Sequence, residues 1–270
     1  MSIEVVAEIG INHNGSLETA KDLVNIALES GCNRVKFQHY AVEDFLPKRV
    51  PNLELETWLR HCEMSLEFSA AIAEYCNVHQ VPWFTSPTIS RIMEAVRLGS
   101  SLLKCSSDMV TDHGFLEALA ASGKPLILST GMAYPYEVDY AVEKLRPNLK
   151  VILHCTSQYP TPYQEIHLAR MTALEIRHGS AFAYGYSDHT ARDNPVPALL
   201  AAAMGAVMIE KHITLDSSQE GPDHALSLPP RELKRYVAMI RSVEVMLGEL
   251  TVEPTSLERA SRAAILKDLP

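Results

Sequence analysis

Residues 186–214 read YSDHTARDNPVPALLAAAMGAVMIEKHIT, and the order of polar and apolar residues in this stretch indicates how the chain folds. A run with helical character, 196–203, separates two polar ends, and the short apolar segment 206–209 leads into the second of them. We interpret the stretch as a strand end, a helix and a second strand end. His189 and His212 are then expected at the same rim of a parallel sheet.

Two histidines at one rim are candidate ligands of a divalent metal, because neutral imidazole is a common metal ligand. In the alternative interpretation, His189 and His212 each cap a strand by hydrogen bonding and bind nothing. These residues alone leave both interpretations open.

A short apolar segment followed by a helical one occurs eight times along the chain. The predicted strand and helix pairs are 3–9 with 17–31, 34–38 with 55–78, 81–86 with 89–99, 101–106 with 113–123, 125–130 with 135–145, 149–155 with 166–179, 181–186 with 196–205, and 206–212 with 230–248. Eight such units in about 250 residues predict an α/β fold of the (β/α)8 TIM barrel type. A doubly wound open sheet is the alternative, but it binds its ligand at one switch point, whereas polar residues follow almost every strand here.

The composition excludes several classes of protein. The formal net charge of -9 argues against nucleic acid or an anionic membrane as the main partner. No apolar stretch reaches the roughly 18 residues of a membrane helix, and the first residues lack signal-peptide features. The five cysteines form no C-x-x-C pair, so we expect neither a disulfide framework nor a structural zinc site, and a cytoplasmic location fits best. With no Pro-, Gly- or Ser-rich linker, we expect one barrel domain over residues 1–250 and an arm or linker remnant over residues 251–270.

Polar residues at the predicted strand ends indicate an anionic substrate. Lys36 and Lys104 bring two ammonium groups to the mouth of the barrel, and hydroxyl donors follow on five strands, at Ser86, Ser107, Ser129, Ser157 and Ser187. Cations with a ring of hydroxyls suit a phosphate or a carboxylate. Each lysine alone could instead extend along the surface, and a serine at a strand end often only satisfies backbone groups.

Two acidic residues are candidates for work at the same mouth. Glu8 ends an apolar strand, where it could act as a general base or water-orienting group, or could form only a structural ion pair with Lys36. Asp223 lies in GPDH (221–224), after the last predicted strand, where it could meet a polar substrate and His224 could be merely exposed.

Eight blocks of the sequence, in order, resemble the barrel domain of sialic acid synthases. They are AEIGINHNG (7–15), VKFQ (35–38), FTSP (84–87), GKPLILSTGM (123–132), LHCTSQYPTP (153–162), GYSDHT (185–190), IEKHIT (209–214) and GPDHALSL (221–228). The resemblance implies a transferase that condenses phosphoenolpyruvate with an open-chain aldose, N-acetylmannosamine or a related N-acylated hexosamine. The products would be a nonulosonic acid and phosphate.

The resemblance also implies roles for individual residues. His189 and His212 would hold a divalent metal that polarises the aldehyde oxygen. Mn²⁺ is expected first, with Mg²⁺ or Co²⁺ as alternatives. Glu8 would orient or deprotonate the water that attacks C2 of the intermediate. The residues that would bind the phosphate and carboxylate of phosphoenolpyruvate are Lys36, Lys104, Ser107, Ser129, Ser157 and Ser187, and those that would face the sugar are Gln38, Tyr159 and Asp223.

The sequence departs from the family pattern in three places. After the fourth strand, the acidic residue that contacts the sugar has either moved to Asp108 or been lost to Met109, which leaves the sugar open. An asparagine of some members is Ser157 here. The family usually carries a C-terminal antifreeze-like domain that supplies an arginine to the partner subunit's sugar, and this chain ends where that domain would begin. We expect a homodimer, in which a separate chain could supply the lid.

Three other functions compete with this interpretation. A related phosphoenolpyruvate-dependent synthase acting on a different sugar is favoured by the altered segment around Met109. A non-catalytic sugar-binding partner subunit would not need Glu8 together with two histidines and two lysines. A metal-dependent hydrolase would leave the lysines and the ring of serines unexplained.

Overall fold

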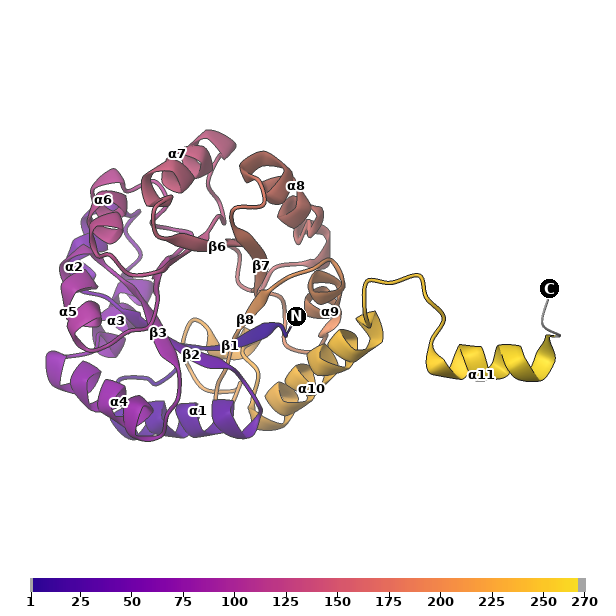
Figure 1. The fold of residues 1–270 in the computed structure, drawn as a ribbon. Helices are drawn as coiled ribbons and strands as arrows, with labels where there is room; N and C mark the ends of the chain where they lie inside the picture. Colours follow the sequence, from indigo (N-terminus) through magenta and orange to yellow (C-terminus); the bar gives the residue numbers. More distant parts are fainter. Residues whose placement is uncertain (1, 267–270) are drawn as a thin grey trace.

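Eight strands pair in chain order, each parallel to the next, and the last pairs with the first, so that the sheet closes into a barrel (Figure 1). This computed structural model describes residues 2–266. The strands are β1 (Glu4–Gly10), β2 (Arg34–His39), β3 (Trp83–Pro87), β4 (Leu103–Cys105), β5 (Leu126–Ser129), β6 (Leu149–His154), β7 (Ala183–Asp188) and β8 (Met208–His212). The predicted (β/α)8 barrel is confirmed.

Helices follow the strands and form the outer ring of the barrel (Figure 1). The α-helices are α1 (Leu17–Glu29), α2 (Val42–Phe45), α3 (Leu53–Cys62), α4 (Leu66–Val78), α5 (Ile92–Arg97), α6 (His113–Ala121), α7 (Pro135–Leu145), α8 (Ala169–His178), α9 (Val196–Ala203), α10 (Pro230–Leu247) and α11 (Ser256–Ile265). Short 3-10 turns are η1 (Leu46–Lys48), η2 (Ile89–Arg91), η3 (Tyr163–Glu165) and η4 (His224–Leu226).

The inside of the barrel is layered, because side chains alternate between the two faces of each strand. One layer is apolar and lies closer to the amino ends of the strands than the cavity does. Its buried residues are Val6, Phe84, Ile127, Leu153 and Met208. Two positions further along the same strands come Glu8, Ser86, Ser129, Cys155 and Glu210, which line a cavity at the carboxyl ends of the strands. The sequence period therefore places polar groups on a packed apolar floor.

Strand-end residues of the opposite parity face the helices instead. Lys211 lies 3.4 Å from the Asp188 carboxylate and donates to the Thr190 carbonyl at 2.6 Å. From α10, the Tyr236 hydroxyl donates to the other oxygen of Asp188 at 3.0 Å. All these side chains are buried. They join the last helix of the ring to β7 and β8 and lie outside the cavity.

Most predicted bounds differ from the observed ones by one to three residues, and two differences concern the arrangement of the elements. The helical region predicted over 55–78 is two helices, because Ser65 begins a new helix by accepting a hydrogen bond from the Phe68 backbone N–H at 3.1 Å. A serine cap of this kind starts a helix regardless of the apolar pattern on both sides. The seventh strand, predicted over 181–186, runs two residues later, so that His189 follows it directly.

The C-terminal segment leaves the barrel after α10. Helix α11 lies apart from the ring (Figure 1), and every residue in it is exposed. The division into a domain over 1–250 and an arm over 251–270 stays a prediction. Within residues 2–266, the structure contains no helix with the length and apolar character that crossing a bilayer requires.

Candidate active site

A cavity of about 480 Å³ opens at the carboxyl ends of the strands, where TIM-barrel enzymes carry out their chemistry. Twelve of the thirteen predicted site residues line it: Glu8, Lys36, Gln38, Ser86, Lys104, Ser107, Ser129, Ser157, Tyr159, His189, His212 and Asp223. Ser187 is the exception. Its buried hydroxyl donates to Glu210 at 3.0 Å and lies 3.2 Å from His189 Nε2, so it contacts two lining side chains from behind.

The floor of the cavity holds two lysines and two carboxylates. Lys36 lies 2.9 Å from Glu8 Oε1 and 3.6 Å from Glu210 Oε1, and Lys104 lies 2.5 Å from the same oxygen of Glu210. All four side chains are buried. Sequence reasoning missed Glu210, although its position two residues before His212 on one strand places both on the same face.

The two carboxylates have opposite pKa shifts. Burial raises the pKa of Glu8 to about 7, although Lys36 opposes the shift. Burial would also raise the pKa of Glu210, but Lys104 and Lys36 outweigh it and lower that pKa to about 2. Burial would lower the pKa of Lys36, but Glu210 and Glu8 outweigh burial and hold that pKa above its ordinary value. Glu210 is therefore a permanent anion near neutral pH, whereas Glu8 titrates there.

Glu8 has one engaged and one free oxygen. Its Oε1 pairs with Lys36 and accepts from Gln38 Nε2 at 3.0 Å, whereas its Oε2 is buried without a hydrogen-bond partner. The ion pair that the sequence left as an alternative is thus present, and the free oxygen is still available to hold a water or receive a proton.

A cluster of hydroxyls from three strands forms the next part of the wall. The Ser157 hydroxyl donates to Ser107 Oγ at 2.8 Å, and Ser129 Oγ is buried without a partner. Gly131 allows the two serines to meet, because a Cβ there would overlap both Ser107 and Ser157, and its φ of +40° also favours glycine. This wall therefore presents the unpaired Ser129 hydroxyl to the cavity that Lys104 also lines.

His189 and His212 face one another across the end of β7 and β8, with ring centroids 5.8 Å apart. His189 Nδ1 lies 2.8 Å from the Thr156 carbonyl, so Nδ1 carries the proton and Nε2 presents a lone pair. The Tyr159 ring stacks on His189 at 4.3 Å. Burial lowers the pKa of His189 to about 4 and that of His212 well below its ordinary value. Both imidazoles are therefore neutral, as metal ligands must be.

The histidines fit a divalent metal held by two protein ligands. His212 Nδ1 is buried without a hydrogen-bond partner and lies 3.6 Å from the Asp223 carboxylate. In the described part of the chain, no group of three or more His, Cys, Asp and Glu residues is placed to hold a metal. The remaining ligands of such a metal would be water or substrate, and catalytic metal sites keep such positions open.

A third wall comes from the long loop after β2 and from the segment after β4. Among its lining residues are Phe45, Arg49, Leu59, Asp108 and Met109. The Arg49 guanidinium pairs with the Asp108 carboxylate and lies over the Phe45 ring, 4.4 Å from its centroid. The sequence left open whether the acidic residue had moved to Asp108 or been lost to Met109. In the structure, Asp108 lines the cavity, next to Met109.

Two more residues in the loops around the cavity had no site role predicted from the sequence. Arg49 was not predicted, since it lies in a polar loop with no strand pattern to orient it. His224, for which exposure was one possibility, is buried. Its Nδ1 lies 2.7 Å from the Thr214 hydroxyl and its Nε2 lies 3.1 Å from Asn14 Oδ1, so it joins the loop after β8 to the loop after β1.

Comparisons with known proteins agree with one another. The family model described as the NeuB family matches residues 23–251. The N,N'-diacetyllegionaminic acid synthase of Legionella pneumophila is 34% identical, over 100% of this chain and 80% of its own length. The N-acetylneuraminate-9-phosphate synthase of Drosophila melanogaster is 32% identical, over 90% of this chain and 68% of its own length. The crystal structure of an N-acetylneuraminic acid synthetase from Leptospira borgpetersenii, in complex with citrate, has a TM-score of 0.88 at 29% identity, covering 98% of this chain and 93% of that chain.

Proposed function

Because this chain belongs to the NeuB family and is therefore a phosphoenolpyruvate-dependent transferase of the sialic acid synthase type, we propose that its aldose substrate is N-acetylmannosamine or a related N-acylated hexosamine. The product would be a nonulosonic acid, released together with phosphate. The observation that carries the proposal is the single cavity in which paired lysines, free hydroxyls, a titratable carboxylate and two neutral histidines meet.

The anionic substrate is assigned to the lysine and serine side of the cavity. Phosphoenolpyruvate carries a phosphate and a carboxylate, which need several donors in a low-dielectric site. Lys36 and Lys104 supply charge, and the free Ser129 hydroxyl and the Ser107 and Ser157 pair supply hydrogen bonds. Ser187 acts in this proposal as a positioning residue, through its contacts to Glu210 and His189.

Glu210 adjusts the charge of this side. Its carboxylate shares one oxygen between Lys36 and Lys104. Glu210 and Glu8 hold the pKa of Lys36 above its ordinary value, whereas burial lowers the pKa of Lys104 although Glu210 opposes the shift. Without Glu210, both buried lysines would lose their protons more readily. The substrate's anionic groups then meet donors that are already oriented.

The aldehyde is assigned to the histidine side. A divalent metal, Mn²⁺ in the first place with Mg²⁺ or Co²⁺ as alternatives, would be held by His189 and His212 and would polarise the aldehyde oxygen as a Lewis acid. The Thr156 carbonyl fixes the His189 ring by accepting from its Nδ1–H, which leaves Nε2 as the ligand atom. Tyr159, Gln38 and Asp223 line the space on this side and would contact the sugar.

The reaction proceeds in two bond-forming steps. C3 of phosphoenolpyruvate attacks the aldehyde carbon, which forms the new carbon–carbon bond and leaves electron deficiency at C2. The aldehyde oxygen takes up a proton and becomes a hydroxyl. Water then adds to C2 and gives up a proton, which leaves a tetrahedral carbon that carries a hydroxyl and the phosphate. The C2–O bond to phosphate breaks, phosphate leaves with the bonding electron pair, and loss of the hydroxyl proton gives the ketone. Glu8 takes the proton from that water, since its free Oε2 has a pKa near 7 and faces a cavity with Lys36 beside it.

The test is a coupled measurement of phosphate release and product mass. Purified protein is incubated with Mn²⁺ and phosphoenolpyruvate, first with N-acetylmannosamine and then with a panel of other aldoses. We expect phosphate only when an aldose is present, with a product mass equal to that of pyruvate plus the aldose. Phosphate release without any aldose, or none with every aldose, would contradict the proposal.

A further inference from the structure

The cavity has a side that the condensation chemistry does not use. It is the third wall, formed by Phe45, Arg49, Leu59, Asp108 and Met109. Its apolar members are buried, whereas Arg49 and Asp108 are each about one third exposed, at 33% and 32% of their side chains. The wall is therefore an apolar surface with one ion pair at its open edge.

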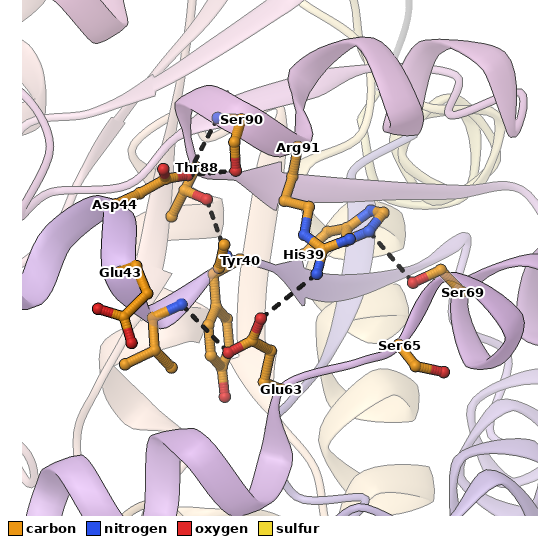
Figure 2. A network of polar contacts seen from close by, with 12 residues as sticks. His39, Tyr40, Glu43, Asp44, Glu63, Ser65, Ser69, Thr88, Ser90 and Arg91 are labelled. Carbon is orange, nitrogen blue, oxygen red and sulfur yellow. Dashed lines mark hydrogen bonds and ion pairs between the residues drawn. The ribbon is translucent and has the colours of Figure 1, made fainter.

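The loop that carries Arg49 is held in place by a network of polar contacts (Figure 2). The Asp44 carboxylate accepts from both the backbone N–H and the hydroxyl of Ser90, at 3.0 and 2.7 Å. The Ala41 backbone N–H donates to Thr88 Oγ1 at 2.9 Å, and the Val42 N–H donates to Glu63 at 3.2 Å. The start of the loop is thus joined to the segment after β3 and to the end of α3.

Ion pairs behind this loop complete the network. Arg91 donates to Glu63 at 3.3 Å (Figure 2). It also donates to Glu94 at 2.8 Å, and Glu94 lies 3.1 Å from His39 Nε2. At the other end of the loop, Lys48 pairs with Asp112. Arg49 therefore leaves a loop that is fixed on both sides, which reduces the entropy lost when its side chain contacts a ligand.

The charges of the wall balance one another. Arg49 is already neutralised by Asp108, and the guanidinium also lies over the Phe45 ring. An uncharged sugar leaves this pair intact, since hydroxyl and amide oxygens accept from the guanidinium edge while hydroxyl groups donate to the carboxylate. The phosphate of a phosphorylated sugar would have to separate this pair to reach Arg49, which would leave the Asp108 carboxylate unpaired beside a second anion in a partly buried site.

We infer that the ion pair of Arg49 and Asp108 is a specificity-determining element that selects an uncharged N-acylated aldose over a phosphorylated one. Arg49 binds oxygen atoms of the sugar, Asp108 repels a phosphate, and the apolar surface of Phe45, Leu59 and Met109 accommodates the acyl group. This inference rests on the proposed function and adds to it the charge class of the sugar and the residues that read it.

The experiment compares N-acetylmannosamine with N-acetylmannosamine 6-phosphate at saturating phosphoenolpyruvate and Mn²⁺. Wild-type protein is expected to have a kcat/KM at least about tenfold higher for the uncharged sugar. Arg49→Gln is expected to raise the KM for this sugar about tenfold, the size of one lost charge-assisted hydrogen bond, with the KM for phosphoenolpyruvate unchanged. Asp108→Asn removes the repelling charge and is expected to reduce the preference about tenfold.

Matched controls separate recognition from folding. Arg49→Lys keeps the charge without the planar fork and is expected to recover part of the affinity. Arg177→Gln breaks an exposed pair with Asp139, between α7 and α8, and is expected to change neither KM. An Arg49→Gln protein that unfolds at the wild-type temperature and keeps the wild-type sugar KM would overturn the inference, as would an unchanged preference in Asp108→Asn. If neither sugar leads to phosphate release, the proposed substrate is wrong, and the inference falls with it.

Discussion

At the scale of single residues, Glu8 and Glu210 show how neighbours decide what a carboxylate does. Both are buried on the same floor, yet Glu210 has two lysines close to one oxygen, whereas Glu8 has one. The pKa of Glu210 is about 2 and that of Glu8 is about 7. Two titratable groups with separated pKa values divide the work between charge compensation and proton transfer.

This difference predicts a pH dependence. Glu8 must be deprotonated to accept a proton from water, and its pKa is about 7. The value of kcat is therefore expected to rise with pH through about 7 and to fall below it as Glu8 becomes protonated. Glu8→Gln is expected to lower kcat about 100-fold to 10,000-fold and to remove this limb of the profile. Steady-state rates from pH 5.5 to 8.5 measure both effects; a limb that persists in Glu8→Gln would assign it to another group.

The metal assignment is tested by binding, apart from activity. The Thr156 carbonyl binds Nδ1 of His189 and so leaves Nε2 free for the metal. His189→Ala removes this ligand, and we expect Mn²⁺ affinity to fall at least about 100-fold. Isothermal titration with Mn²⁺ measures this. His113→Gln is the matched control, because His113 stacks on Tyr140 in the outer ring of helices. Equal Mn²⁺ affinity in His189→Ala and wild-type protein would exclude this residue as a ligand.

At the scale of elements, the ends of β4, β5 and β6 determine the anion side of the cavity. Their continuations bring Ser107, Gly131 and Ser157 together from three strands. The approach depends on the absence of a side chain at Gly131 as much as on the hydroxyls. A residue without functional groups thus controls where two donors lie.

Gly131→Ala tests this packing. The new Cβ would overlap both serines, so we expect the KM for phosphoenolpyruvate to rise about tenfold or more as the donors are displaced. The positive φ adds a destabilisation on the order of 1–3 kcal/mol. Gly123→Ala is the matched control, because Gly123 has a φ of +70° but no heavy atom within 4 Å of an added Cβ. Thermal unfolding should show a loss of stability from the positive φ in both variants, with a further loss in Gly131→Ala from the overlap with the serines. Kinetics should show a changed KM only in Gly131→Ala.

At the scale of the whole molecule, the barrel carries its own core, and residues 251–266, the described part of the C-terminal segment, add no buried side chain to it. The apolar layer inside the strands and the buried residues between strands and helices make up the core, whereas α11 is exposed throughout its length. The expected homodimer, a lid from another chain and a cytoplasmic location stay predictions. An exposed helix beyond the ring contributes little to the stability of the ring itself.

Truncation tests the predicted domain boundary. Removal of residues 251–270 is expected to change the free energy of unfolding by no more than about 0.5 kcal/mol, since no described residue of α11 is buried. Tyr236→Phe is the comparison, because it loses the hydrogen bond to Asp188 that joins α10 to β7, and it is expected to cost about 1 kcal/mol. Urea unfolding of both proteins measures the difference. A larger loss from truncation than from Tyr236→Phe would place the boundary beyond residue 250.

The sequence by itself determined the fold class, the order of the strands and twelve of the residues that line the cavity. Eight apolar segments alternating with helical ones are a local pattern, and in a closed parallel barrel every strand end reaches one mouth. For this reason Lys36 and Lys104, as well as the two histidines, could be predicted as neighbours although they lie on different strands. The alternation along β8 also places Glu210 on the same face as His212, so its position in the cavity could have been predicted.

Only the tertiary structure decided which side chains pair. Lys104 and Glu210 are 106 residues apart, and no local period states that one carboxylate oxygen serves two lysines. The pair of Arg49 and Asp108 joins two loops whose backbones are held by contacts elsewhere, such as that of Asp44 with Ser90. Periodicity orients residues within an element, whereas contacts between loops depend on how the elements pack. The charge balance of the cavity is therefore a property of the closed barrel.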